Sequence, residues 1–233
     1  MKKILFVLFL ILSSCVNSSI HNKNVFFRGT FLKIEKKVTI SACNPANPKQ
    51  CLKKTYQSSA SSFLIRNNGN KSYLLTAAHV CHTDYGRLHL LPNFQVKEDF
   101  YGINHEMKKF NYKVHKLDLK NDLCLVVSER IGSRPYRIAV RTPSLGRLIY
   151  NIAAPVGIYE KGVVPLFKGF YSGESYEKSV YSLPAAGGSS GSPILNNDGE
   201  VIGVVSAVTR DFNQIVISPT LKQIRRFVYS EKL

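Results

Sequence analysis

Residues 187–193 read Gly-Gly-Ser-Ser-Gly-Ser-Pro, and this stretch decides how the rest of the chain is interpreted. Ser190 stands at its centre, and the apolar residues Ile194 and Leu195 follow it. Such a run is typical of a tight glycine loop that enters a buried strand. A loop of this kind can expose a hydroxyl while its backbone N–H groups converge on a neighbouring oxyanion. Glycine–serine loops are common, so the motif does not establish a function by itself.

Two motifs upstream give the loop a chemical context. Leu-Thr-Ala-Ala-His occupies residues 75–79, and Asn-Asp-Leu-Cys-Leu-Val occupies residues 121–126. With Ser190 they supply a histidine, an aspartate and a serine, in that order. A serine hydroxyl is a poor nucleophile at neutral pH unless an adjacent base takes its proton. The pattern therefore predicts a catalytic triad of His79, Asp122 and Ser190.

Each residue of the predicted site has a role in this interpretation. His79 takes the proton of Ser190 and later protonates the leaving amine, while Asp122 fixes the imidazole tautomer. The backbone N–H groups of Gly188 and Ser190 form the oxyanion hole. Asp118 is a competing carboxylate, but Leu-Lys follows it instead of an apolar run. The structural alternative is a histidine that only follows a strand, an aspartate that only makes a turn, and glycines that only bend the loop.

Together the motifs resemble those of the chymotrypsin-fold serine peptidases, particularly the bacterial HtrA-like and glutamyl-endopeptidase-like branches. The family's histidine follows a strand that ends in Thr-Ala-Ala-His, which matches His79. Its aspartate opens a strand that begins Asp-Leu, which matches Asp122. Its serine lies in a Gly-x-Ser-Gly-Gly/Ser-Pro loop, which matches residues 188–193. The resemblance covers about residues 25–230, so it describes the whole folded chain.

The resemblance implies an all-β fold of two six-stranded Greek-key β-barrels with a C-terminal α-helix. Residues 25–132 would form the N-terminal barrel with the histidine and the aspartate, and residues 133–233 the C-terminal barrel with the serine. The residues by themselves indicate only a mostly β chain, because short β-rich runs alternate with turn signals such as Asn67-Asn68-Gly69-Asn70. An apolar stripe over residues 221–228, with Ser218 as its cap, predicts the terminal helix.

The predicted strands are short and separate. Among them are the predicted strands at residues 37–41, 58–66, 109–117 and 201–208.

The resemblance also locates the pocket for the side chain before the scissile bond. It is lined by the residue six positions before the nucleophile, Pro184, and by the later strand Ser206-Ala207-Val208. Pro184 offers no acid to bind lysine or arginine, and Val208 stands where wide pockets have glycine. We therefore expect a shallow pocket for small or medium apolar residues. Ser206 is also expected to hydrogen-bond Asp122, as its counterpart does in the family.

Residues 1–14 predict an export signal of the lipoprotein type. Two lysines precede an apolar run over residues 4–12, which is too short to cross a bilayer as a mature helix. The run ends in Leu-Ser-Ser-Cys, which resembles a bacterial lipobox. Cys15 would then carry the lipid, and residues 15–24 would tether the protein to a periplasmic or cell-surface membrane. The alternative is an ordinary secretory signal, with Cys15 discarded and the protein secreted.

Apart from Cys15, four cysteines remain, and an even number suits an oxidising compartment. Cys43 and Cys51 bracket a turn-rich loop and are the best candidates for a disulfide. Cys81 and Cys124 lie two residues after the predicted catalytic histidine and aspartate, so they are close if that pair touches. Alternatively, Cys124 is a small buried residue in a strand.

The chain is strongly basic, with 32 Lys and Arg against 15 Asp and Glu and a net charge of +17. The basic residues are scattered and no nucleic-acid-binding motif accompanies them, so we expect no nucleic-acid partner. Solubility and attraction to anionic membranes or acidic substrates are the expected roles. The sequence has no HExxH motif and no paired CxxC motifs, so no metal or organic cofactor is implied.

These observations favour an exported serine endopeptidase that acts on peptides or proteins. A lipase or esterase would need the serine in an elbow between a strand and a helix, whereas the residues after Ser190 predict a strand. The remaining alternative is a catalytically silent lipoprotein that keeps the fold and acts by binding.

The lipobox interpretation predicts that cells expressing the protein incorporate labelled palmitate into it. A Cys15→Ala variant should lose the label, because the thiol is the attachment point. Equal labelling of wild type and variant, measured on the immunoprecipitated protein, would exclude Cys15 as the lipid site.

Overall fold

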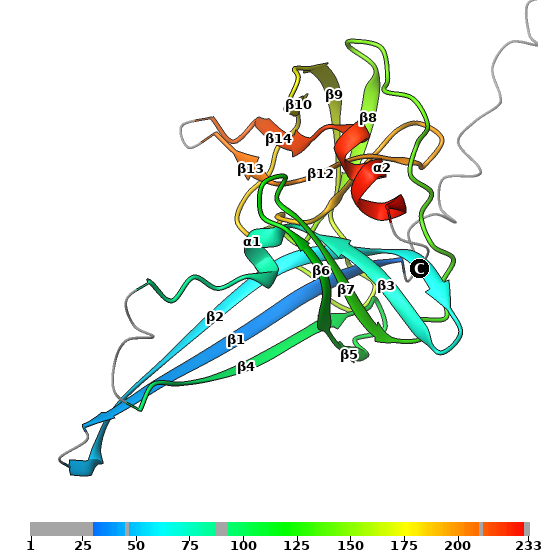
Figure 1. Ribbon diagram of the computed structural model, residues 1–233. Coiled ribbons are helices and arrows are strands. Elements are labelled where there is room, and N and C mark those ends of the chain that lie inside the picture. The colour runs from blue at the N-terminus through cyan, green and yellow to red at the C-terminus, as the bar shows by residue number, and fades with distance from the viewer. Residues whose placement is uncertain (1–29, 45–46, 87–92, 210–211, 231–233) are drawn as a thin grey trace, which may run out of the picture.

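The computed structural model of the protein describes residues 30–44, 47–86, 93–209 and 212–230. It confirms the predicted all-β architecture: two antiparallel sheets and a short C-terminal helix (Figure 1). The first sheet is built from residues 31–129 and the second from residues 148–219.

The first sheet has seven strands in the order β5-β4-β1-β2-β3-β7-β6. Its strands are β1 (Phe31–Asn44), β2 (Asn47–Asn68), β3 (Lys71–Thr76), β4 (Gln95–Ile103), β5 (Lys109–Asn111), β6 (Lys113–Asp118) and β7 (Leu123–Glu129).

The second sheet also has seven strands, in the order β12-β11-β8-β9-β10-β14-β13. Its strands are β8 (Leu148–Ile152), β9 (Leu166–Glu174), β10 (Lys178–Ser182), β11 (Pro193–Leu195), β12 (Val201–Val204), β13 (Ala207–Val208) and β14 (Ile215–Pro219). A 3₁₀ turn, η3 (Pro155–Gly157), precedes β9.

The seventh strand of each sheet arises from a break in one predicted strand. The predicted strand at 109–117 is divided at Tyr112, whose N–H donates to the Phe100 carbonyl at 3.0 Å. The predicted strand at 201–208 is divided at residues 205–206. The two strands that result from each break, β5 and β6 in the first sheet and β12 and β13 in the second, are the outermost strands of their sheet. The ends of each sheet are therefore neighbours in the chain, and each sheet closes on itself as a barrel.

Aromatic contacts join the first barrel to the second half of the chain. Phe31 on β1 packs against Tyr159 with ring centroids 5.6 Å apart, and Phe63 on β2 meets Tyr136 edge to face at 6.0 Å. All four rings belong to one buried cluster that continues through the second barrel. Burial of this apolar surface holds the two barrels together.

Ser61 on β2 connects the first barrel to the loop that follows β10. Its side chain is fully buried. Its N–H donates to the carbonyl of Ser190 at 2.8 Å, and its hydroxyl donates to the carbonyl of Gly188 at 2.8 Å. The same hydroxyl accepts a hydrogen bond from the N–H of Ala154 at 3.2 Å. One serine thus fixes the loop that carries Ser190 against the other barrel.

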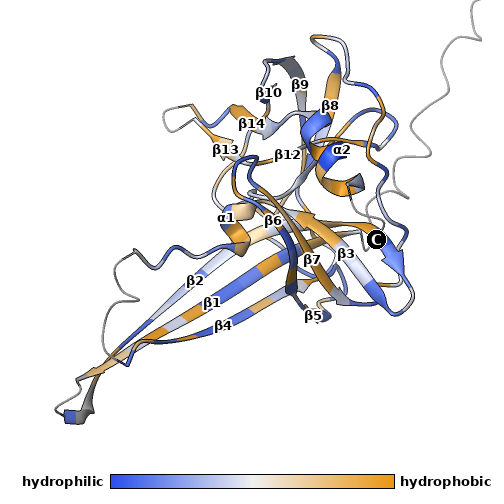
Figure 2. Cartoon of the chain, in the orientation of Figure 1, coloured by the Kyte–Doolittle hydropathy of each residue, from blue (hydrophilic) through white to orange (hydrophobic). Residues whose placement is uncertain are grey.

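Strands β1 and β2 extend beyond the barrel as a long hairpin, with β4 along one side (Figure 1). We call this projection the arm and define it as residues 36–58 of the hairpin with their β4 partners. Short strands at 37–41 and 58–66 were predicted, and the structure instead continues β1 and β2 toward the Cys43–Cys51 disulfide at the tip. Along β1 of the arm, polar residues alternate with Val38, Ile40 and Ala42, as expected for a strand with two different faces, whereas the arm part of β2 is mostly hydrophilic (Figure 2).

The N-cap of helix α2 (Leu221–Tyr229) lies two residues later than predicted. Ser218 lies in β14, where its hydroxyl accepts a hydrogen bond from the N–H of Val204 at 2.9 Å. Thr220 is the actual N-cap and forms a capping box with Gln223. None of the helices within the described residues combines the length and the apolar character that a bilayer crossing requires.

Candidate active site

His79 lies in the four-residue helix α1 (Ala78–Cys81), directly after β3. Its helix neighbours Ala78, Val80 and Cys81 are buried, whereas the His79 side chain is 49% exposed. The apolar neighbours anchor the turn in the barrel, and this anchoring leaves the imidazole at the surface.

Asp122 lies in the turn between β6 and β7. The carboxylate of Asp118 holds this turn by accepting hydrogen bonds from the backbone N–H of Asn121 at 3.0 Å and from its side-chain amide at 2.6 Å. Asp122 has a φ of 52°, a left-handed conformation that aspartate adopts more readily than most residues. Asp118, the competing carboxylate, therefore organises the turn that presents Asp122.

The structure brings His79 and Asp122 into direct contact. The ring Nδ1 lies 3.0 Å from Oδ1 and 2.9 Å from Oδ2 of Asp122, and the backbone N–H of His79 donates to Oδ1 at 2.9 Å. The hydroxyl of Ser206 donates to Oδ2, as the family resemblance led us to expect. Burial acts to raise the pKa of Asp122, but the hydrogen bonds from His79 and Ser206 outweigh it and hold that pKa below its ordinary value.

A disulfide joins Cys81 at the end of α1 to Cys124 on β7. Each cysteine lies two residues after one member of the His79–Asp122 pair. The cross-link therefore ties the helix that carries the imidazole to the strand that follows the carboxylate. It limits how far the two side chains can separate.

Ser190 follows a tight turn of residues 186–189. The N–H of Ser189 closes this turn by donating to the Ala186 carbonyl at 2.9 Å. Gly188, the third residue of the turn, has a φ of 93°, and a Cβ there would lie 2.3 Å from the Ala154 carbonyl oxygen. Only glycine fits this position. No backbone hydrogen bond from the N–H of Gly188 or Ser190 is found among the described residues.

His79 and Ser190 line the same groove, which has a volume of about 470 Å³. No hydrogen bond joins the Ser190 hydroxyl to the His79 ring within the described residues. In enzymes without bound substrate, such catalytic contacts are often long and tighten when substrate binds. His79 and Ser190 thus line one groove, and Asp122 contacts His79.

Lys36 is a site residue that the sequence did not identify. Its side chain is only 6% exposed, and its ammonium donates to the carbonyls of Val80 at 3.3 Å and Cys81 at 3.2 Å, and to the Thr83 hydroxyl at 2.7 Å. Glu98 lies 3.7 Å away as its counter-ion. Burial lowers the pKa of Lys36, which Glu98 partly offsets.

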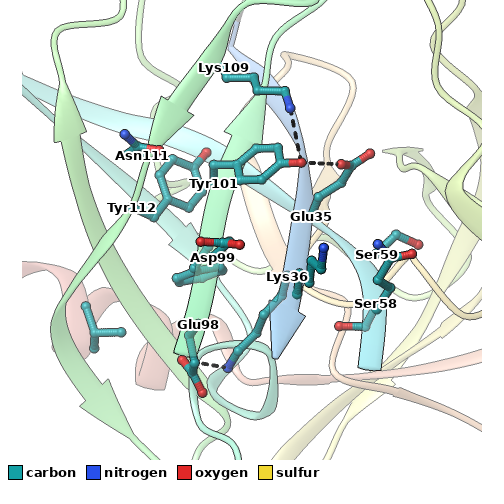
Figure 3. Close-up of a pocket in the computed structure, with 14 residues that line it drawn as sticks. Glu35, Lys36, Ser58, Ser59, Glu98, Asp99, Tyr101, Lys109, Asn111 and Tyr112 are labelled. Carbon is teal, nitrogen blue, oxygen red and sulfur yellow. Dashed lines mark hydrogen bonds and ion pairs between the residues drawn. The ribbon is translucent and has the colours of Figure 1, made fainter. Parts of the chain in front are cut away.

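Lys36 therefore caps the carbonyl end of the helix that carries His79. Figure 3 shows its ion pair with Glu98 beside a larger polar cavity of about 1120 Å³. That cavity lies at the root of the arm and is not lined by His79 or Ser190. A lysine in an alternating strand looks like an exposed residue in the sequence, so only its position beneath α1 reveals the contact.

The expected pocket residues surround β14 in the second barrel. Ala207 and Val208 pair with Ile217 and Val216 of that strand. Pro184 is held on both sides by backbone hydrogen bonds. The N–H of Leu183 donates to the Gln214 carbonyl at 2.7 Å, and the N–H of Ala185 donates to the Asn213 carbonyl at 3.0 Å. Ser206 differs from the others because its hydroxyl is engaged by Asp122.

A Ser206→Ala substitution should destabilise the fold by about 1–2 kcal/mol at pH 7, because the partly exposed Asp122 carboxylate loses a donor. The pKa of Asp122 is lowered in the fold, so its hydrogen bonds stabilise the protein above the ordinary pKa of an aspartate, about 3.9. That stabilisation is lost as the pH falls through the lower, folded-state pKa. Urea unfolding measures the free energy of unfolding of both proteins at pH 7 and at pH 3. The difference between wild type and Ser206→Ala should be smaller at pH 3 than at pH 7. A difference that does not change with pH would contradict this account.

Comparison with known proteins agrees with this geometry. The model of the trypsin-like peptidase domain matches residues 60–204, more than half of the chain. A comparison with curated protein sequences finds no match.

Solved proteases share the fold. The active form of the Rv3671c protease from M. tuberculosis is 15% identical, with a TM-score of 0.58 over 83% of this chain and 79% of that one. The serine endoprotease from Yersinia pestis is 14% identical, with a TM-score of 0.58 over 83% of this chain and 61% of that one. The structural likeness shows the fold, and the family match shows that the chain belongs to the trypsin-like peptidase domain family.

Proposed function

We propose that the chain is an exported, lipid-anchored serine endopeptidase that forms an acyl-enzyme on Ser190. The observation that carries the proposal is the contact of His79 Nδ1 with the Asp122 carboxylate at 2.9–3.0 Å, at the mouth of a groove that Ser190 also lines. Since the fold is that of a protease, the substrates are peptides or proteins.

In the proposed mechanism Ser190 Oγ attacks the carbonyl carbon of the scissile bond while its proton passes to His79 Nε2. The C–N bond then breaks, and His79 protonates the leaving amine. A water molecule, deprotonated in turn by His79, then attacks the acyl ester; the bond from the acyl carbon to Ser190 Oγ breaks, and His79 returns the proton to Ser190. Asp122 remains ionised throughout, because it holds the Nδ1–H of His79 and stabilises the imidazolium.

The oxyanion of each tetrahedral intermediate would be bound by the N–H groups of Gly188 and Ser190. This assignment is supported because, within the described part of the chain, neither N–H makes a backbone hydrogen bond. Preformed donors stabilise developing charge without reorganising, and loss of one typically costs about 3–4 kcal/mol of transition-state stabilisation.

For the acyl side of the substrate we propose a shallow pocket for small or medium apolar residues. It would be lined by Pro184, Ala207 and Val208, with Ser206 at its Asp122 end. None of these residues carries a charge that would bind an acidic or basic side chain.

Export is supported by the two disulfides, which indicate an extracytoplasmic protein. The signal over residues 1–14, the lipid on Cys15 and the tether over residues 15–24 lie outside the described residues. They are proposed from the sequence pattern alone.

The proposal predicts that the protein cleaves a diverse peptide library and that Ser190→Ala abolishes the cleavages. The expected loss is about a thousandfold or more, because the nucleophile is removed. Mass spectrometry of the products identifies the cut sites and the residues around them. Ser172→Ala, an exposed serine on β9, serves as the control. Identical products from wild type and Ser190→Ala would reject catalysis by Ser190, and the absence of cleavage by either would favour a silent binding protein.

The proposal also predicts that Lys36→Met lowers kcat about 10- to 100-fold. The apolar replacement leaves the Val80 and Cys81 carbonyls without their hydrogen-bond donor. Helix α1 then no longer holds the His79 imidazole in its position against Asp122. Lys36→Arg should restore part of the loss. Lys37→Met is the matched control, because Lys37 is the exposed neighbour on the opposite face of β1. A wild-type kcat in folded Lys36→Met would contradict the positioning role.

A further inference from the structure

The groove that His79 and Ser190 line continues away from them along the arm. One wall is formed by Val38, Ile40 and Tyr56 of the arm, and the other by the chain that follows His79, as far as Tyr85. Polar residues such as Lys36, Thr83 and Asp84 also line it, but most of the surface that the groove exposes is apolar. This apolar groove is therefore continuous with the site of chemistry.

Strand pairing explains why the arm presents these residues together. Val38 and Tyr56 are directly opposite each other in the β1–β2 hairpin, and Ile40 lies two residues further along the same face. Lys36 lies on this face as well and reaches across to the carbonyls after His79. The ammonium of Lys36 therefore spans the gap between the two walls and fixes their spacing.

The chemistry determines which half of a substrate the groove would meet. The half before the scissile bond stays on Ser190 as the acyl group, and the half after it leaves with a proton from His79. The leaving half must therefore lie on the His79 side of Ser190. The groove begins there and, apart from Ser190, is lined only by the first barrel. The residues proposed for the acyl side all lie in the second barrel.

We propose that this apolar groove binds the part of the polypeptide substrate that follows the scissile bond and selects a bulky aliphatic or aromatic residue there. The proposal rests on the proposed peptidase function and adds a specificity determinant to it. Tyr56 is 46% exposed and Ile40 is half-buried, so both still offer apolar surface to a substrate side chain. Covering that surface favours an apolar residue over a small polar one by about 10- to 100-fold.

The test compares two fluorogenic peptides that share the sequence before a mapped cut and carry leucine or serine directly after it. Wild type should cleave the leucine peptide with at least about tenfold higher kcat/KM. Ile40→Ser and Tyr56→Ser, made separately, should each reduce this ratio severalfold. Leu52→Ser is the matched control, since Leu52 is 70% exposed on the same hairpin and does not line the groove.

All rates are divided by the concentration of working enzyme, titrated with a fluorophosphonate that modifies Ser190 and has no peptide leaving group. A variant that folds poorly then loses titratable sites without changing the ratio, and the second variant provides an independent reading. The groove proposal would be overturned by a leucine-to-serine ratio of kcat/KM near one in wild type, or by an unchanged ratio in both variants. No fluorophosphonate labelling and no cleavage in wild type would instead defeat the peptidase proposal itself.

Discussion

The hydrogen bonds of Ser61 are the constraint on which the site depends. A catalytic centre assembled from two barrels works only if the barrels keep a fixed relation, and Ser61 bonds directly to the backbone on both sides of Ser189, at Gly188 and Ser190. Gly191 makes this approach possible, because a Cβ there would lie 2.1 Å from the Thr76 hydroxyl. The loop that carries the nucleophile is thus packed against the strands that lead to His79.

The proposed acid–base pair is restrained from several directions. The Asp122 carboxylate accepts hydrogen bonds from His79 of the first barrel and from Ser206 of the second, so it also links the barrels. The Cys81–Cys124 disulfide limits the separation of their supporting elements, and Lys36 caps the end of α1. Restraint of this kind is needed because small displacements of a general base reduce its rate steeply.

Much of this could be predicted from the sequence, for physical reasons. Alternating β-rich runs and turn signals indicated the mostly β chain, and the ordered motifs around His79, Asp122 and Ser190 carried the family resemblance. The strand breaks at Tyr112 and at residues 205–206 could not be predicted, because closure of each sheet causes them and the local composition does not. The predicted N-cap of α2 was wrong by two residues, because Ser218 belongs to β14 and its hydroxyl is bound to the N–H of Val204.

By itself, the sequence determined the fold class, the family and the residue types available for catalysis, because these depend on local motifs and their order. The tertiary structure alone decided which groups surround them. Lys36 beneath α1, Ser61 at the barrel junction and the apolar groove along the arm all arise from contacts between residues distant in the chain. Strand pairing and barrel packing create such contacts, and neither is encoded by any one segment.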